Sequence, residues 1–186
     1  MNIKNLIILF IILMLMACNF KRLDNSSSDK LDTLKFNSSF SYTDSSLVDN
    51  YVSEDFVSNA LNNYTIAVIN KKYLNILHCS KEAVVNRHDA SVTDTIYTFS
   101  NAENKIQIYR AKENDFIFTF EVKDSIFNLS GNIKPGITKE TFSRKFKINE
   151  DIDNKVQIFN SEGTMRFMFY FENNRLKRIN SYLYLD

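Results

Sequence analysis

The sequence predicts an α+β protein with an antiparallel sheet. The chain of 186 residues carries 16 Phe and 9 Tyr but only 3 Gly and 1 Pro, and aromatic residues are enriched in strands. From about residue 92, apolar and polar residues alternate, which is the period of a half-buried strand. Two other segments have the apolar spacing of a helix. We therefore expect an antiparallel sheet built from two helix-plus-meander units, with the helices packed on one face.

Two helices are expected from their capping residues and apolar spacing. Ser53, followed by two acidic residues, is a good N-cap, and the apolar positions in 56–61 form one stripe. A second helix is expected after Pro135-Gly136, with Thr138 as its cap and Phe142 and Phe146 four residues apart. The segments 64–69 and 73–79 are compatible with either a strand or a helix.

The strands are expected where the alternation is clearest, in segments 96–99, 106–108, 116–122, 156–159, 165–171 and 176–185. In the third of these, alternation predicts that Phe116, Phe118, Phe120 and Val122 line one face. The last two strands are expected to form a hairpin that turns at Asn173-Asn174, since Asn tolerates positive φ better than most residues.

The chain also resembles itself. Residues 104–109 match 154–159 at an offset of 50, and residues 116–122 then match 165–171 at an offset of 49. Either the two hairpins descend from a duplicated unit, or two amphipathic hairpins are alike by chance. The predicted organisation is one α+β domain over 47–186, with candidate tandem units at about 47–130 and 131–186.

The first residues predict a secretory signal. After Lys4, residues 6–16 are an apolar run of 11 residues, whereas a membrane-spanning helix needs about 20. Residues 1–17 are therefore predicted to be a signal peptide. Residues 18–46 are rich in Ser, Asn and Asp and are predicted to be a polar, flexible tether. Within it, Leu34, Phe36 and Phe40 are expected to form a short extended piece that docks on the domain.

The end of this signal, Leu15-Met16-Ala17-Cys18, resembles the lipobox of bacterial lipoproteins. The resemblance implies that the chain is cleaved before Cys18 and that Cys18 is lipidated, as palmitate labelling would detect. Several acyl chains then anchor the protein to the lipid bilayer. It also implies a cell-envelope location, on the periplasmic or surface side of the outer membrane where one exists, because no Asp follows the cysteine.

Charge excludes a nucleic-acid partner. The chain has 23 basic and 22 acidic side chains, and removal of residues 1–17 takes one basic residue, Lys4, which leaves 22 of each sign. Nucleic-acid binding requires a clustered excess of Lys and Arg.

Once Cys18 is lipidated, Cys79 has no partner for an internal disulfide.

Residues 133–140, with Phe142, and residues 169–176, with Ile179, together resemble the SmpA/BamE outer-membrane lipoproteins and the fold they share with β-lactamase inhibitory protein. The resemblance covers residues 131–182 and implies a helix followed by a hairpin that packs on it. Two departures weaken the functional analogy: no Gly or Pro occurs between Phe146 and Asp153, and Asn174 stands where the family has Gly.

No familiar catalytic or metal-binding motif is present, and no cofactor is expected. The one cluster of chemically active residues is His78-Cys79 with His88-Asp89. It is compatible with a thiol nucleophile, Cys79, served by His88, or with a metal site, or with a buried thiol and two surface imidazoles.

The last predicted strand offers a candidate partner surface. If Leu183 and Leu185 face the core, Tyr182 and Tyr184 lie outside beside Arg178, and Tyr and Arg are enriched at interfaces. The alternative is that the tether or a helix covers them.

Three tripeptides also resemble the O-glycosylation acceptor of some envelope proteins, with Thr33, Thr95 and Ser125 as the modified residues.

These observations predict a membrane-anchored envelope lipoprotein that is not an enzyme and that binds a protein partner, as an assembly accessory or scaffold. The alternative is an inhibitor or immunity lipoprotein that neutralises a toxin or an enzyme. The second alternative is a small hydrolase that depends on Cys79 and His88 or on a metal.

Overall fold

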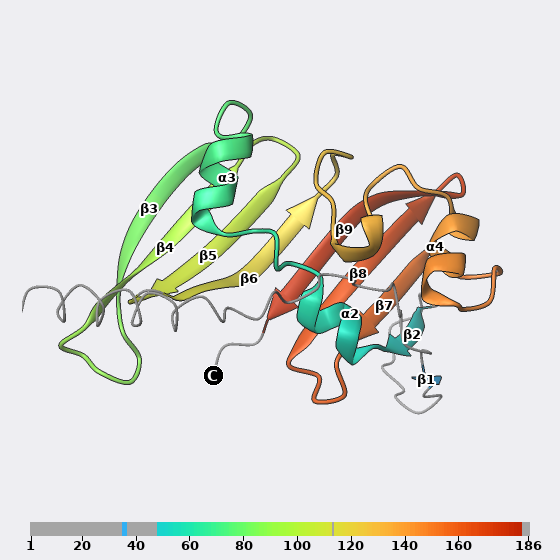
Figure 1. The fold of residues 1–186 in the computed structure, drawn as a ribbon, viewed down its shortest axis with the longest axis horizontal. Helices are drawn as coiled ribbons and strands as arrows, with labels where there is room; N and C mark the ends of the chain where they lie inside the picture. Colours follow the sequence, from blue (N-terminus) through green and yellow to red (C-terminus); the bar gives the residue numbers. More distant parts are fainter. Residues whose placement is uncertain (1–34, 37–47, 113, 184–186) are drawn as a thin grey trace, which may run out of the picture. The chain divides into compact units, whose positions relative to one another are not determined.

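The protein is an α+β protein with one mixed sheet. A computed structural model describes residues 35–36, 48–112 and 114–183, all within a unit that runs from Leu31 to Asp186. The sheet has nine strands in the order β1-β2-β7-β8-β9-β6-β5-β4-β3 (Figure 1). The predicted signal peptide, Cys18 and most of the predicted tether lie outside the described residues.

Three α-helices and one short 3-10 helix accompany the strands. The helices are α2 (Glu54–Asn59), α3 (Ile66–Tyr73), η1 (Ser130–Asn132) and α4 (Lys139–Phe146). The strands are β1 (Lys35–Phe36), β2 (Asp49–Val52), β3 (His78–Val85), β4 (Thr93–Ser100), β5 (Lys105–Ala111), β6 (Asn114–Val122), β7 (Lys155–Phe159), β8 (Met165–Glu172) and β9 (Arg175–Leu183). None of these helices is long and apolar enough to cross a membrane.

The sheet consists of two antiparallel runs that meet at β6 and β9. Strands β3 to β6 pair with their sequence neighbours, and so do β7 to β9. The runs join where Phe120 lies opposite Ser181 and Val122 opposite Ile179. Beyond β7, β2 pairs in parallel and β1 pairs antiparallel with β2. Phe36 therefore lies in a short extended piece, as the sequence predicted.

The predicted helix caps are confirmed. The Ser53 side chain accepts the backbone N–H of Phe56 at 3.4 Å, and the Thr138 side chain accepts the N–H of Thr141 at 3.1 Å. The ambiguous segment 64–69 starts α3, because the Thr65 side chain accepts the N–H of Val68 at 3.2 Å. These side-chain acceptors satisfy amides that have no partner within the helix.

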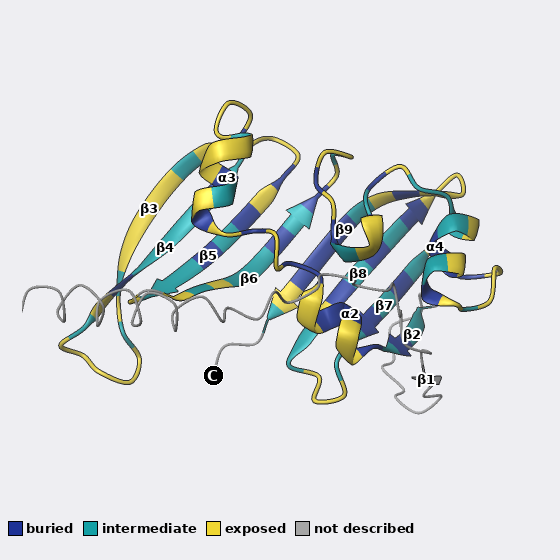
Figure 2. Ribbon diagram, viewed as in Figure 1, coloured by how far each residue is buried: buried dark blue, intermediate teal, exposed yellow. Residues whose placement is uncertain are grey.

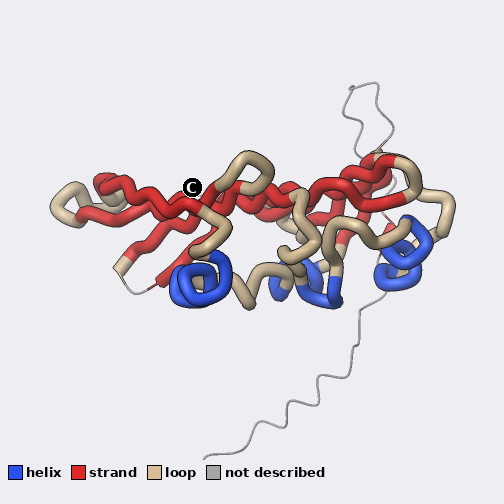
Figure 3. The backbone as a smooth tube through the Cα atoms, turned by 90° about the horizontal axis from the view of Figure 1, so that it is seen from above, coloured by secondary structure: helices blue, strands red, loops and turns tan. Residues whose placement is uncertain are grey.

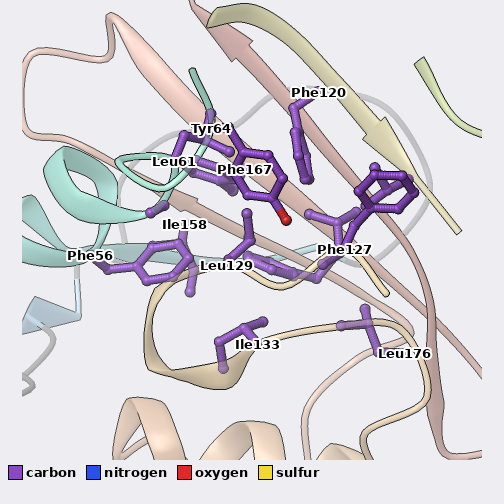
Figure 4. Close-up of a cluster of buried hydrophobic side chains, with 14 of the residues drawn as sticks. Phe56, Leu61, Tyr64, Phe120, Phe127, Leu129, Ile133, Ile158, Phe167 and Leu176 are labelled. Atoms are coloured by element: carbon purple, nitrogen blue, oxygen red, sulfur yellow. The ribbon is translucent and has the colours of Figure 1, made fainter. Parts of the chain in front are cut away.

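All three α-helices lie on the same side of the sheet, as Figure 3 shows. The buried phenylalanines of α2 and α4 contact those of β8: the ring centroids of Phe56 and Phe167 are 5.2 Å apart, and those of Phe142 and Phe169 are 4.8 Å apart. Figure 4 shows Phe56 and Phe167 in this core, together with Phe120. Burying each such side chain contributes about 1.5–3 kcal/mol. Aromatic side chains therefore bind α2 and α4 to the sheet, whereas α3 buries Ile66 and Ile69.

One prediction for the strands is wrong. Phe120 and Val122 are fully buried, but Phe116 is 42% exposed and points away from the helices. The cause is a bulge: Gln107 lies opposite Thr119 whereas Ile108 lies opposite Ile117, so Phe118 is an extra residue. An extra residue inverts the alternation beyond it, and Ile117 packs against the core in place of Phe116.

The predicted hairpin between β8 and β9 is confirmed. Asn173 and Asn174 have φ values of 49° and 63°, the left-handed conformation that a two-residue hairpin turn requires at both positions. Asn174 therefore takes up the backbone conformation for which the SmpA/BamE pattern uses Gly.

Candidate interaction surface

The side of the sheet opposite the helices carries a compact group of polar and aromatic side chains. Along β7 and β8, buried residues alternate with less buried ones (Figure 2). The buried residues face the helices, so the others face away from them, and among the described residues no helix lies on that side (Figure 3). We call nine outward positions of β7, β8 and β9 the open face: Lys155, Gln157, Phe159, Arg166, Met168, Tyr170, Arg178, Asn180 and Tyr182. The next outward residue of β8, Glu172, lies beside the hairpin turn and pairs with Lys177 at 3.9 Å.

Strand register places these side chains in three rows across the sheet. The rows are Lys155–Tyr170–Arg178, Gln157–Met168–Asn180 and Phe159–Arg166–Tyr182. Adjacent strands lie about 4.8 Å apart, so neighbours within a row are in contact range. The open face therefore presents one continuous surface.

The open face is cationic and aromatic. The positive groups are Lys155, Arg166 and Arg178, and none of the nine residues is acidic. Arg178 Cζ lies 4.0 Å from the centroid of the Tyr170 ring, and Lys155 Nζ lies 5.9 Å from it. A guanidinium held over a ring face is attracted by the ring quadrupole, which favours a fixed position for the Arg178 charge.

Two buried polar atoms on the open face have no hydrogen-bond partner among the described residues. Asn180 is only 6% exposed; its Nδ2 donates to the Tyr182 hydroxyl at 3.0 Å, but its Oδ1 accepts from no described residue, and Arg178 Nε donates to none. A buried unpaired polar atom costs about 1–3 kcal/mol. Such groups require an explanation in a native protein; the Ser143 and Ser181 hydroxyl oxygens on the helix side are also unpaired among the described residues.

A hollow of about 490 Å³ opens on the same face. Its lining comes from the strands and from the loop between β7 and β8: Gln157, Thr164, Arg166, Met168, Tyr182 and Leu183. Arg166 makes no hydrogen bond or ion pair to any residue that the structure describes. The hollow thus brings the apolar side chains of Met168 and Leu183 next to a cation that has no partner among the described residues.

A second polar cluster lies on the same side of the sheet, on β4 and β5, and differs in being satisfied. The Asp94 carboxylate, 3% exposed, accepts the Asn86 amide at 2.6 Å and the Tyr109 hydroxyl. The hydrogen bond to Asp94 is the main cause that raises the pKa of Tyr109. Because these groups partner one another, the cluster closes the β3–β4 hairpin and leaves little to offer a ligand.

The structure brings together two of the three predicted partner residues. Arg178 and Tyr182 both lie on the open face, in its first and third rows, and Tyr182 is 43% exposed. Tyr184 lies outside the described residues. Sequence reasoning missed Arg166, Met168 and Tyr170, although they alternate with the buried phenylalanines of β8 and that alternation was visible in the sequence.

The candidate glycosylation residues differ in accessibility. Ser125 is exposed in the loop after β6. Thr95 lies within β4, where it is half-buried and paired between Ala83 and Arg110. Thr33, like the lipidation residue Cys18, lies outside the described residues.

The structure does not bring Cys79 and His88 together. Cys79 lies near the start of β3, opposite Phe99, and packs against the core, whereas His88 lies in the loop beyond the end of β3. Six residues of strand separate Cys79 from Val85, about 20 Å at the usual rise. His78 points to the face opposite Cys79. No group of three His, Cys, Asp or Glu among the described residues could hold a metal ion.

Comparison with known proteins adds no assignment: no protein-family model matches the chain, and neither a curated protein nor a solved structure does. The arrangement of side chains on the open face is therefore the observation from which a function is argued.

Proposed function

We propose that this protein is a lipid-anchored cell-envelope protein with a non-enzymatic role, whose domain binds a partner protein through the open face. The binding role rests on one observation: three cations and several aromatic or apolar side chains share a sheet face that none of the described helices covers. Tyr and Arg dominate the binding energy of many interfaces, and an uncovered amphipathic face of this kind is typical of an interaction site.

The anchor rests on the sequence. The apolar run, the small residue before Cys18 and the polar segment after it support lipidation and cleavage at that cysteine. With residues 18–46 as a tether, the domain would stand off the outer membrane, with the open face available on the periplasmic or surface side. The partner would be an envelope-assembly component; a toxin or enzyme that the domain inhibits is the alternative.

The fold belongs to the same proposal. Each antiparallel run follows helices in the chain, α2 and α3 before the first and α4 before the second, which supports two related helix-plus-meander units. Gly136 has a φ of 99° just before the Thr138 cap, as the SmpA/BamE opening would require of its glycine. We infer a relationship to that fold, while function has to be argued from the open face.

Palmitate labelling tests the anchor. We expect the protein in intact cells to incorporate labelled palmitate and to fractionate with membranes, and Cys18→Ser to abolish both. Cys79→Ser is the matched control, because it removes the other cysteine and should retain label and fractionation. The anchor would be refuted if the Cys18→Ser variant still incorporated palmitate, or if that variant still fractionated with membranes.

Site-specific photo-crosslinking tests the binding role. A benzophenone amino acid in place of Tyr182, which is 43% exposed on the open face, should form an adduct with a defined protein in intact cells. The same group in place of Leu74, which is 55% exposed at the end of α3 on the helix side, is the control. The proposal would be contradicted if position 182 gave no adduct, or if both positions gave the same adduct. The identity of the captured protein shows whether the partner is an envelope-assembly component or a toxin or enzyme.

A further inference from the structure

We propose that the open face binds an acidic segment of the partner protein, whose Asp or Glu carboxylates are bound by Arg166 and Arg178. This inference rests on the proposed function and specifies its partner. It depends on three observations: the local charge of the open face, the way its cations are held, and the hollow beside Arg166.

The charge of the open face departs from that of the whole chain. The chain without residues 1–17 has equal numbers of basic and acidic side chains, yet the nine open-face residues carry three cations and no acid. The nearest carboxylate along the second row is Glu121 of β6, which lies opposite Lys105 as well as Asn180. That acid and base offset each other, and Glu172, the outward residue of β8 beyond Tyr170, pairs with Lys177 at 3.9 Å. Both bordering carboxylates therefore have a basic neighbour, and the three cations keep a net positive charge on the open face.

The two arginines present their charge in a form that suits carboxylates. Arg178 Cζ lies 4.0 Å from the centroid of the Tyr170 ring, and its buried Nε donates to no described residue. Arg166 lies opposite Tyr182 and has no recorded partner among the described residues. A guanidinium binds a carboxylate through two parallel hydrogen bonds, and pre-orientation by an aromatic ring lowers the entropy lost on binding.

The hollow explains why a protein segment fits better than a membrane surface. Arg166 lines it with Met168 and Tyr182, so a side chain that enters would meet apolar contact and a cation together. Anionic headgroups instead attract exposed basic residues through a diffuse field and need no such cavity. A peptide that carries carboxylates among apolar residues would satisfy both features.

Charge reversal tests the inference in the full-length, membrane-anchored protein. In cells with the crosslinker at position 182, Arg166→Glu should lower the adduct yield at least about tenfold, because like charges would then face each other across the interface. Lys72→Glu makes the same charge change at an exposed site in α3 and should leave the yield unchanged. Arg166→Lys keeps the charge without the planar fork and should retain part of the yield.

A second measurement uses defined probes. The purified protein in detergent should bind a fluorescent poly-glutamate peptide more tightly than a poly-lysine peptide, with affinity that falls as salt rises, and Arg166→Glu should abolish that binding. Equal unfolding midpoints for Arg166→Glu and Lys72→Glu would show that both variants fold; if Arg166→Glu does not fold, Arg166→Gln takes its place.

The outcomes separate the two proposals. A normal adduct from Arg166→Glu would overturn the acidic segment while leaving protein binding intact. No adduct from the protein that carries the crosslinker at position 182 and no other change would overturn the binding role itself. Tight binding to vesicles of phosphatidylglycerol that depends on Arg166, without binding to poly-glutamate, would assign the open face to the membrane and refute the inference.

Discussion

Asn104 offers the sharpest test of how the sheet is held together. It is 2% exposed, and its Nδ2 donates to Asn101 Oδ1 at 3.0 Å and to Asp124 Oδ2 at 2.6 Å. Its Oδ1 accepts the backbone N–H groups of Lys123 at 2.9 Å and Asp124 at 3.3 Å. One amide thus ties the β4–β5 turn to the segment that leaves β6.

The substitution Asn104→Asp keeps the volume and the acceptor but replaces the donor with a second carboxylate oxygen. A hydrogen bond to a charged group contributes about 1.5–3 kcal/mol, and two carboxylates in contact add repulsion of about 1 kcal/mol or more. We therefore expect the free energy of unfolding at pH 7 to fall by about 3 kcal/mol. Protonation of the introduced carboxyl restores a donor, so the loss should shrink as the pH is lowered.

Urea denaturation followed by circular dichroism, on the purified protein in detergent, measures this change. The matched control is Asn63→Asp, which adds the same charge at an exposed turn and should change stability by less than about 0.5 kcal/mol. The reasoning fails if the two variants unfold at the same urea concentration at pH 7, or if the loss at Asn104 does not depend on pH.

Three further variants test the core, a cap and an ion-dependent contact. Phe142→Ala removes a fully buried ring and should cost about 3–5 kcal/mol in urea denaturation; a loss below 1 kcal/mol would mean that α4 does not pack as described. Thr138→Ala removes the acceptor for the Thr141 N–H and should cost about 1 kcal/mol, whereas Thr138→Ser should cost little. The Ser161 hydrogen bonds lower the pKa of Glu54, so this contact stabilises the wild type above the ordinary Glu pKa, and the stabilisation is lost as the pH falls through the lowered pKa. Glu54→Gln should therefore unfold at a lower temperature than the wild type at pH 7 but not in acid. A difference in unfolding temperature that does not depend on pH would refute the contact.

Local patterns predicted most of the elements. Ser53 and Thr138 cap helices because a side-chain oxygen one turn from a free amide acts locally. The Asn173-Asn174 turn likewise depends on the backbone preference of two residues. The strands from β4 to β9 follow alternation, which reports which face of a strand is buried.

The faces of β6 could not be predicted in the same way. Phe116 and Phe120 are the same residue type at even spacing, yet only Phe120 is buried. The extra residue at Phe118 is defined against β5, a different strand, and no local pattern within β6 marks it. Segment 64–73 also became a helix with help from a distant residue, since Asp115 accepts the N–H of Ile66 at 3.2 Å.

The amino-acid sequence by itself showed the apolar run of residues 6–16 shortly before Cys18. It also predicted the α+β class, the helix caps and the hairpin turn, because each depends on neighbours along the chain. Only the tertiary structure decided which strands lie side by side, and hence that Arg166, Tyr170 and Arg178 share one face of the sheet. It also decided that Cys79 and His88 stand at opposite ends of a strand. The physical reason is that pairing and helix packing join residues far apart in the chain, whose contacts no periodicity within one segment encodes.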